Sequence, residues 1–162
     1  MGINIVLVEP EIPQNTGNIA RTCAALNIDL HIIGSIPFVI SERTVKRAGL
    51  DYWPYVRLHR HENLDDFFSI YPLEYCILTS SRGQHLYTEF SYPRSHQDCA
   101  LLFGKESTGL PTSFIEQHRE RSIHIPMRPE IRSLNLANTV AILAYYIASQ
   151  HNFSSILNQR SS

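Results

Sequence analysis

Short apolar runs rich in β-branched residues alternate with helical patterns along the whole chain. The apolar runs predict strands at residues 3–8, 30–33, 55–58, 75–79, 99–103 and 122–125. Helical periodicity predicts helices at residues 16–26, 41–48, 63–70, 111–117 and 134–150. Alternation of this kind is typical of a parallel sheet covered by helices. We therefore predict an α/β fold built on a parallel sheet.

The length of the chain favours a single domain. Its 162 residues, 43% of them hydrophobic, suit one compact core. We expect this domain to span residues 1–157 and to be followed by a polar tail at 158–162. The most apolar run, residues 140–148, is too short to cross a bilayer, and residues 1–9 resemble a strand rather than a signal peptide. The expectation is a cytoplasmic protein without a membrane partner.

The net charge, the cysteines and the histidines each argue against some classes of function. The net charge of −1 rules out a globally basic surface, so any contact with RNA must come from a local patch. The three cysteines, Cys23, Cys76 and Cys99, are far apart in apolar surroundings, which predicts buried thiols. The eight histidines are scattered and form no His-x-x-x-His pair, so no metal site is expected.

Candidate chemistry lies in the loops that follow the predicted strands. In an open parallel sheet, ligands bind outside the carboxyl ends of the strands. Four such loops carry polar residues, at 9–21, 78–83, 103–111 and 125–135.

The first of these loops runs into a helix. Asn15 or Thr16 is expected to cap that helix. Arg21 follows Asn18 by about one turn, so both side chains can face the loop, where backbone amides also favour an anion. An ion pair between Arg21 and one of the loop's glutamates is an equally good interpretation.

The second and third loops are rich in hydroxyl groups and glycine. Arg82 and its neighbours at 79–83 suit a polar ligand, although many strand exits have a similar composition. In the third loop, Gly104 and Gly109 bracket charged and hydroxyl residues and allow a close backbone approach to a ligand. The Walker spacing and the Gly-x-Gly-x-x-Gly fingerprint are both absent, which disfavours an ordinary P-loop or Rossmann nucleotide site.

The fourth loop returns into the C-terminal helix, for which Ser133 and Asn135 are alternative caps. That helix carries a stripe of small residues, which predicts either a buried core helix or a dimer interface. The stripe consists of Ala137, Ala141, Ala144 and Ala148.

Three segments together resemble the sequence motifs of the SPOUT methyltransferases. They are Asn15-Thr16-Gly17-Asn18 with Arg21, Phe103-Gly104-x-Glu106-x-x-Gly109-Leu110-Pro111, and Ile125-Pro126-Met127 leading to Arg132-Ser133-Leu134-Asn135. The segments 9–13 and 48–52 extend the resemblance to the tRNA (cytidine/uridine-34)-2′-O-methyltransferase subgroup, over essentially the whole chain.

This resemblance implies a Rossmann-like SPOUT fold with a C-terminal deep trefoil knot. It also implies that S-adenosylmethionine is bound in the knot, largely through backbone groups, and leaves as S-adenosylhomocysteine, without a metal. The implied cofactor-binding residues are Leu78, Thr79, Gly104, Glu106, Gly109, Ile125, Met127, Ser133 and Leu134.

The implied reaction is methyl transfer to the ribose 2′-hydroxyl of the wobble nucleotide of tRNA, by a homodimer with shared active sites and no role for DNA. By motif position, Arg21, Ser133 and Asn135 surround the point of methyl transfer. The implied RNA-binding residues are Asn15, Asn18, Arg21, Arg82, Lys105 and Tyr145. The resemblance allows two roles for Arg21: it would act as the general base, or it would bind phosphate and orient the hydroxyl. The second role is easier to accept, because a guanidinium with a pKa above roughly 12 is a poor proton acceptor.

Three residues depart from the pattern of close relatives. Lys105 replaces proline and could touch RNA, Leu134 replaces methionine, and Ala137 replaces serine. These departures leave substrate choice open. The alternatives are a related enzyme acting at another tRNA or rRNA position, an RNA-binding protein without turnover and, more distantly, an enzyme of small nucleotides.

Overall fold

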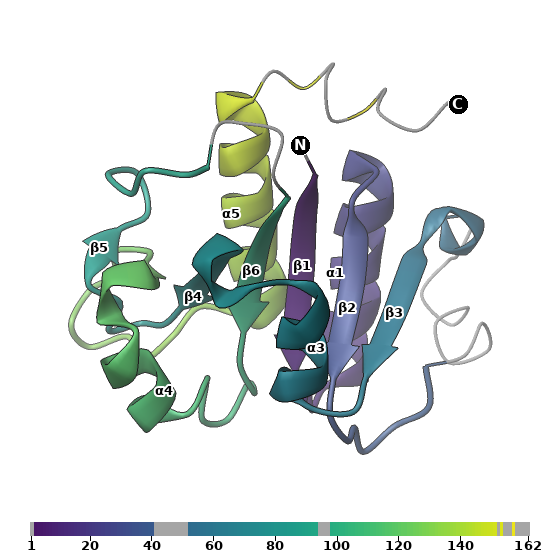
Figure 1. Ribbon diagram of the computed structural model, residues 1–162, viewed down its shortest axis with the longest axis horizontal. Coiled ribbons are helices and arrows are strands. Elements are labelled where there is room, and N and C mark those ends of the chain that lie inside the picture. Colours follow the sequence, from purple (N-terminus) through teal and green to yellow (C-terminus); the bar gives the residue numbers. More distant parts are fainter. Residues whose placement is uncertain (1, 41–51, 94–97, 152, 154–156, 158–162) are drawn as a thin grey trace.

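A single parallel sheet forms the centre of the molecule (Figure 1). The computed structural model describes residues 2–40, 52–93, 98–151, 153 and 157. Seven strands lie in the order β3-β2-β1-β6-β4-β7-β5, and every neighbouring pair is parallel. The strands are β1 (Ile3–Val8), β2 (Asp29–Ile33), β3 (Arg57–His61), β4 (Cys76–Thr79), β5 (His85–Leu86), β6 (Cys99–Phe103) and β7 (Ser122–His124). The predicted parallel α/β sheet is confirmed.

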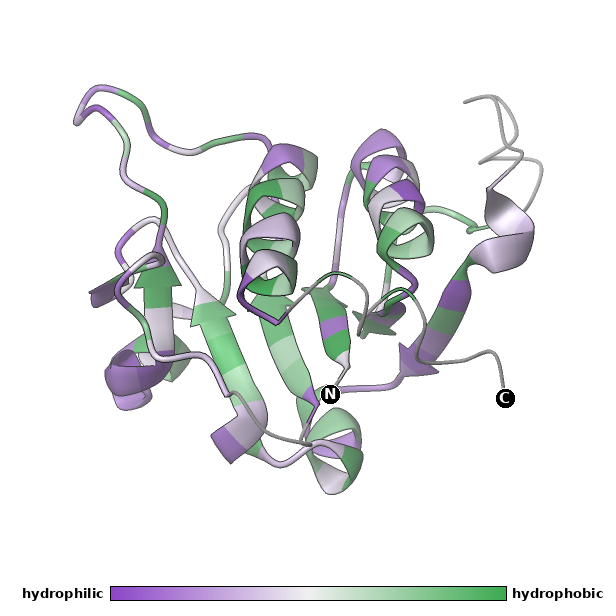
Figure 2. Ribbon diagram, turned by 90° about the horizontal axis from the view of Figure 1, so that it is seen from above, coloured by the Kyte–Doolittle hydropathy of each residue, from purple (hydrophilic) through white to green (hydrophobic). Residues whose placement is uncertain are grey.

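Helices cover both faces of this sheet (Figures 1 and 2). The α-helices are α1 (Pro13–Leu26), α3 (Leu64–Ile70), α4 (Thr112–Gln117) and α5 (Leu136–Gln150), and short 3₁₀ turns are η1 (Trp53–Tyr55), η2 (Leu73–Tyr75) and η3 (Arg119–Arg121). Helices α1 and α5 share one hydrophobic core with the sheet, whereas α3 and α4 contribute to the core on the opposite face. The predicted helix at 41–48 lies outside the described residues.

Burial explains which strands were recognisable from sequence. Strands β1, β2 and β6 are buried at every residue, as expected for parallel strands covered on both faces. Strand β3 lies at one end of the sheet and exposes arginine and histidine, which is typical of a protected edge. The prediction of a strand at 55–58 was therefore wrong in position, because residues 53–55 form η1 and the strand begins at Arg57. The two-residue edge strand β5 was not predicted.

The ends of the two long helices decide the capping predictions. Helix α1 begins at Pro13, which suits the first helical position, and its N-cap Ile12 makes no side-chain bond. The prediction that Asn15 or Thr16 caps α1 was wrong, because both lie inside the helix. In α5 the Asn135 side chain accepts hydrogen bonds from two backbone amides, which identifies Asn135 rather than Ser133 as its cap.

The small-residue stripe of α5 lies mainly inside the molecule. Ala137, Ala144 and Ala148 are buried in the core that α5 shares with α1. This packing favours the core interpretation for these alanines. The outward face of α5 still exposes Ile142 and Tyr145. No helix in the described part of the chain is long and apolar enough to span a membrane.

Candidate functional site

A cavity of about 1090 Å³ opens at the carboxyl ends of β4, β6 and β7. The loops that follow these three strands line it, at residues 79–82, 103–110, 123–129 and 131–136, together with Ile12 and Asn15 from the beginning of α1. This is the edge of the sheet where loops are expected to carry chemistry.

Most of the predicted site residues meet in this cavity. Those that line it are Asn15, Thr79, Arg82, Gly104, Lys105, Glu106, Gly109, Ile125, Met127, Ser133, Leu134 and Asn135. Four others do not line it: Leu78, Asn18, Arg21 and Tyr145. The Leu78 side chain is fully buried in the core at the end of β4, so only its backbone is available to a ligand near this loop.

Two glycines shape the loop after β6. A Cβ on Gly104 would lie 1.9 Å from the backbone carbon of Gly109, so no other residue fits there without a backbone shift. Gly109 has a φ of 73° and donates its amide to the carbonyl of Lys105 at 2.8 Å. A Cβ on Gly109 would meet no atom within 4 Å. The loop therefore closes on itself while leaving open space at Gly109.

Glu106 fastens this loop to the beginning of α1. Its carboxylate accepts hydrogen bonds from the amides of Glu11 (2.7 Å) and Ile12 (3.1 Å) and from the Asn15 side chain (3.2 Å). Three hydrogen bonds within the chain thus hold the partly buried carboxylate in place. Its position explains how the third loop is oriented relative to the first.

Asn135 joins the fourth loop to the same network. Its Nδ2 donates to Oδ1 of Asn15 at 3.0 Å, while its Oδ1 accepts the amides of Ala137 and Asn138. Arg132 adds a second link by donating to the carbonyl of Ser107 at 2.7 Å. The three loops that bear the sequence motifs are consequently bonded together at one end of the cavity.

The loop after β4 completes the cavity wall. The Thr79 hydroxyl donates to the carbonyl of Leu102 at 2.8 Å, and the Ser80 amide donates to the carbonyl of Ile123 at 3.1 Å. Gly83 lies so close to the backbone of Ile123 that a Cβ would approach it to 2.3 Å. Glycine is therefore needed here for packing of this loop against β7.

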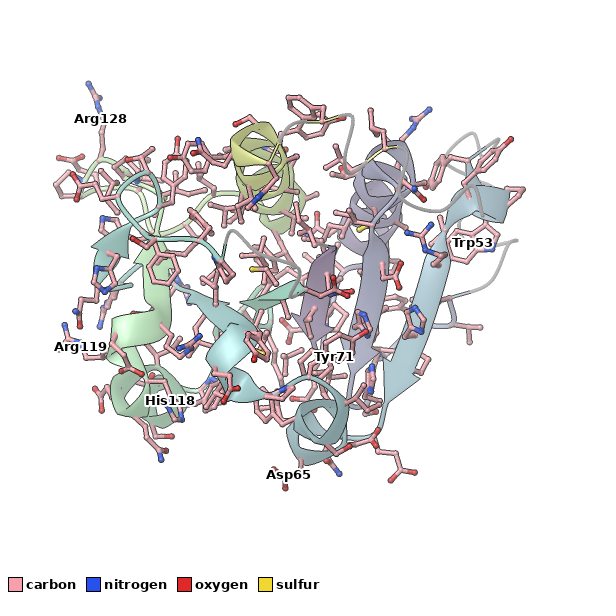
Figure 3. The ribbon with its side chains drawn as sticks, turned by 45° about the horizontal axis from the view of Figure 1, so that its top comes forward. Trp53, Asp65, Tyr71, His118, Arg119 and Arg128 are labelled. Carbon is pink, nitrogen blue, oxygen red and sulfur yellow. The ribbon has the colours of Figure 1, made fainter. Side chains whose placement is uncertain are left out.

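A group of exposed arginines surrounds the cavity and supplies a local basic patch. It consists of Arg82, Arg119, Arg128 and Arg132, all of which line the opening. Figure 3 shows Arg119 beside α4 and Arg128 at the outer end of the fourth loop, pointing away from the body of the molecule. Only Arg82 was predicted as an RNA contact. The others could have been found from their place in or beside the predicted loops, because arginine forks suit phosphate.

Lys105 has a partner within the chain. Its ammonium group lies 3.1 Å from a carboxylate oxygen of Glu9, and both side chains are partly exposed. The predicted contact of Lys105 with RNA remains a prediction, and such a contact would compete with this ion pair.

Arg21 lies away from the cavity, on the outer surface of α1. Its guanidinium carbon is 5.2 Å from the centroid of the Tyr52 ring. Within the described part of the chain, Arg21 forms no ion pair with Glu9 or Glu11. Glu9 instead pairs with Lys105, and Glu11 accepts the amide of Ser107. The ion-pair interpretation was therefore wrong. Asn18 is exposed on the same helix, and Tyr145 is exposed on α5 near Phe153.

Sequence reasoning missed a histidine cluster on β2 and β3. Nδ1 of His31 lies 2.9 Å from Nε2 of His61, and Nε2 of His59 lies 3.1 Å from Asp29. Burial, with smaller contributions from His59 and His61, lowers the pKa of His31 to about 3. The sequence contains the alternating pairs Asp29-x-His31 and His59-x-His61. Only the register between β2 and β3 shows that these side chains lie together.

Three members of this cluster have donor atoms within 4.8 Å of one another, namely Asp29, His31 and His59. The rings of His31 and His59 are stacked at 17° with centroids 4.6 Å apart. Arg57 also holds the Asp29 carboxylate at 2.5 Å. The arrangement is that of a hydrogen-bonded polar cluster.

The thiols are buried as predicted. All three cysteines are free. Burial raises the pKa of Cys76 and of Cys99 to about 12 and raises that of Cys23 further. These groups therefore stay protonated and unreactive at neutral pH.

Comparisons with known proteins agree with this architecture. Residues 2–145 match the model of the SpoU rRNA methylase family. A protein of Lactococcus lactis is 46% identical over 93% of this chain and 90% of its own length, and one of Listeria monocytogenes is 44% identical over 96% and 92%. Both are named tRNA (cytidine(34)-2′-O)-methyltransferase.

Solved structures give the same result. An RNA methyltransferase structure from Bacillus anthracis superimposes with a TM-score of 0.87 at 39% identity, covering 96% of this chain and 98% of its own. A structure described in terms of 2′-OH methylation of C/U34 on tRNA has a TM-score of 0.78 at 40% identity, covering 98% and 97%. The predicted membership is confirmed: this chain belongs to the SpoU rRNA methylase family.

Proposed function

We propose that this protein transfers a methyl group from S-adenosylmethionine to the ribose 2′-hydroxyl of the wobble nucleotide, position 34, of tRNA. The observation that carries the proposal is the cavity at which the three motif-bearing loops converge. The names of the relatives that match over nearly their whole length favour tRNA position 34 over the rRNA in the family's description.

The cavity suits a cofactor of this kind. Its volume of about 1090 Å³ lies just above the usual range for small-molecule sites, roughly 300–1,000 Å³. Apolar side chains of Leu110, Ile125 and Leu136 lie in its lining beside hydroxyls such as Thr79. When bound, S-adenosylmethionine supplies an already activated methyl group on a positively charged sulfur, so no metal is required.

The residues proposed to hold the cofactor act chiefly through the backbone. Gly104, Gly109 and Ile125 bring main-chain groups to the cavity without bulky polar side chains. Glu106 positions the third loop through its bonds to the beginning of α1, which is how we propose that it contributes to cofactor binding. The loops at 103–111 and 125–135 would then form part of a deep trefoil knot.

Three residues are proposed to act on the RNA. Ser133 and Asn135 line the cavity and would orient the ribose, with Asn135 fixed by its bonds to Asn15 and the first amides of α5. Arg21 would bind a phosphate and align the 2′-hydroxyl, while a phosphate or water accepts the proton. A guanidinium with a pKa above roughly 12 is a poor base, which favours this role.

The place of Arg21 supports a homodimer with shared sites. It lies six residues beyond Asn15 on α1, about 9 Å along the helix axis, and outside its own chain's cavity. We propose that Arg21 serves the cofactor site of a second copy. The arginines around the cavity would hold the tRNA backbone, and the protein would act in the cytoplasm.

The test pairs a change in Arg21 with a matched control. Arg21→Ala should lose most methyl transfer to tRNA while S-adenosylmethionine binds with unchanged affinity in calorimetry. Arg60→Ala removes an exposed arginine on β3 and should keep the wild-type rate. A near-normal rate for Arg21→Ala would refute the role given to this residue.

A further inference from the structure

Tyr52 connects the chain before η1 to helix α1 by two contacts. Its hydroxyl donates a 2.8 Å hydrogen bond to the carbonyl of Gly17, and its ring faces the Arg21 guanidinium at 5.2 Å. Gly17 precedes Arg21 by one helical turn, so the ring spans the turn that carries the arginine. One aromatic side chain thus contacts both the backbone beneath Arg21 and its charged group.

Tyr52 is itself firmly placed. It is half-buried and packs against the core shared by α1 and α5, and its carbonyl accepts the amide of Tyr55 in the η1 turn. Burial raises the pKa of the Tyr52 phenol, which keeps the hydroxyl protonated and able to donate to Gly17. Trp53, labelled in Figure 3, follows Tyr52 and packs against the same core.

Arg21, in contrast, is exposed and would otherwise sample many rotamers. An arginine side chain loses rotamer entropy when it is fixed. A ring face beneath the guanidinium restricts the plane of the fork and leaves its N–H edges free for phosphate. A cation–π contact does not consume these donors, whereas an ion pair with a carboxylate would.

We infer that Tyr52 is a positioning residue for methyl transfer, which holds the Arg21 guanidinium over its ring and aimed at the RNA. This inference rests on the function proposed above. It assigns Tyr52 no contact with the methyl group and no proton transfer. Its contribution is to the fraction of molecules in which Arg21 is correctly oriented when the RNA is bound.

Steady-state methyl transfer to tRNA provides the test. Tyr52→Leu removes the ring face and should lower kcat by about fivefold, the size expected from a cation–π contact, with the KM for S-adenosylmethionine unchanged. Tyr52→Phe keeps the ring and should stay within about threefold of the wild type. Tyr55→Leu makes the same change at an exposed position of η1 and should have the wild-type kcat.

A double variant separates positioning from a structural role. If Tyr52 acts through Arg21, then Tyr52→Leu should cost nothing further in the Arg21→Ala background. Melting temperatures identify any variant that fails to fold, and Tyr52→Met then provides a second side chain of suitable size without a ring.

Three results would overturn the inference. The first is a wild-type kcat in folded Tyr52→Leu or Tyr52→Met, and the second is a full additional loss in the double variant. The third is a wild-type protein that methylates no RNA, which would overturn the proposed function together with this inference. If the wild type methylates tRNA and Tyr52→Leu has the same kcat, the inference is overturned but the proposed function is not.

Discussion

Replacing Glu106 by glutamine should loosen the network that joins the motif-bearing loops. The carboxylate accepts three hydrogen bonds, two from backbone amides and one from the side chain of Asn15. Glutamine has the same shape but one acceptor oxygen, so its NH₂ group must face at least one N–H. The change removes charge from the remaining bonds as well.

The expected size follows from these contacts. One or two lost charge-assisted bonds at a partly buried site cost about 2–4 kcal/mol of unfolding free energy. For a domain of this length each kcal/mol lowers the melting temperature by about 2–4 °C, which gives a fall of about 5–15 °C. The affinity for S-adenosylmethionine should fall as well, because Glu106 orients the loop that carries Gly104 and Gly109.

Thermal unfolding and calorimetric titration measure both effects. Glu116→Gln is the matched control, since Glu116 is an exposed residue of α4 that lines the same cavity. It should melt within about 1 °C of the wild type, as expected for a surface substitution. A melting temperature and a cofactor affinity that are both unchanged in Glu106→Gln would refute this account of the loops.

Three further predictions follow from buried groups and glycines. Because the folded pKa of His31, about 3, lies below its unfolded value of about 6.5, stability should be complete above pH 6.5 and decline as the pH falls towards 3. The loss at pH 5 should be about 2 kcal/mol in denaturant melts, and a slope that persists in His31→Gln would contradict this assignment. Gly104→Ala should abolish folding or cofactor binding, because its Cβ would overlap the backbone of Gly109. Gly109→Ala has room for a Cβ but a positive φ, so it should lower the free energy of unfolding by only about 1 kcal/mol. Equal effects of the two variants on the melting temperature would count against this loop geometry. The three cysteine thiols should resist a thiol reagent in the native state at pH 8 and react once the chain is unfolded, and rapid native labelling would disprove their burial.

The core of the sheet was predictable because its strands are continuous apolar runs. The bounds of β1 and β6 agree with the predicted ranges, and both strands are buried at every residue. Strand β3 was misplaced because its sequence, Arg57 to His61, is mostly polar and takes its strand character from pairing with β2. An edge strand of this kind depends on its neighbour rather than on its own hydrophobicity.

The loops of the candidate site were predictable, but the bonds within them were not. Strand ends identified where the cavity would lie. The partners of Glu106 lie more than 90 positions away in sequence, and periodicity contains no information about them. Asn15 was expected to cap α1 but is instead the bridge between Glu106 and Asn135.

Arg21 shows the same limit on a smaller scale. Spacing along α1 placed it near Asn18, but the direction of its side chain is set by Tyr52, which lies outside the helix. The histidine cluster likewise depends on the register that pairs His31 with His59. Contacts between separate elements decide both arrangements.

The central claim is that this chain methylates the wobble ribose of tRNA, and one measurement tests it directly. Labelled methyl from S-adenosylmethionine is offered to tRNA from cells lacking this activity, and the product is digested and located by mass spectrometry. We expect a single 2′-O-methyl group at nucleotide 34. A 2′-O-methyl group at another tRNA or rRNA position, or no incorporation into either RNA, would contradict it.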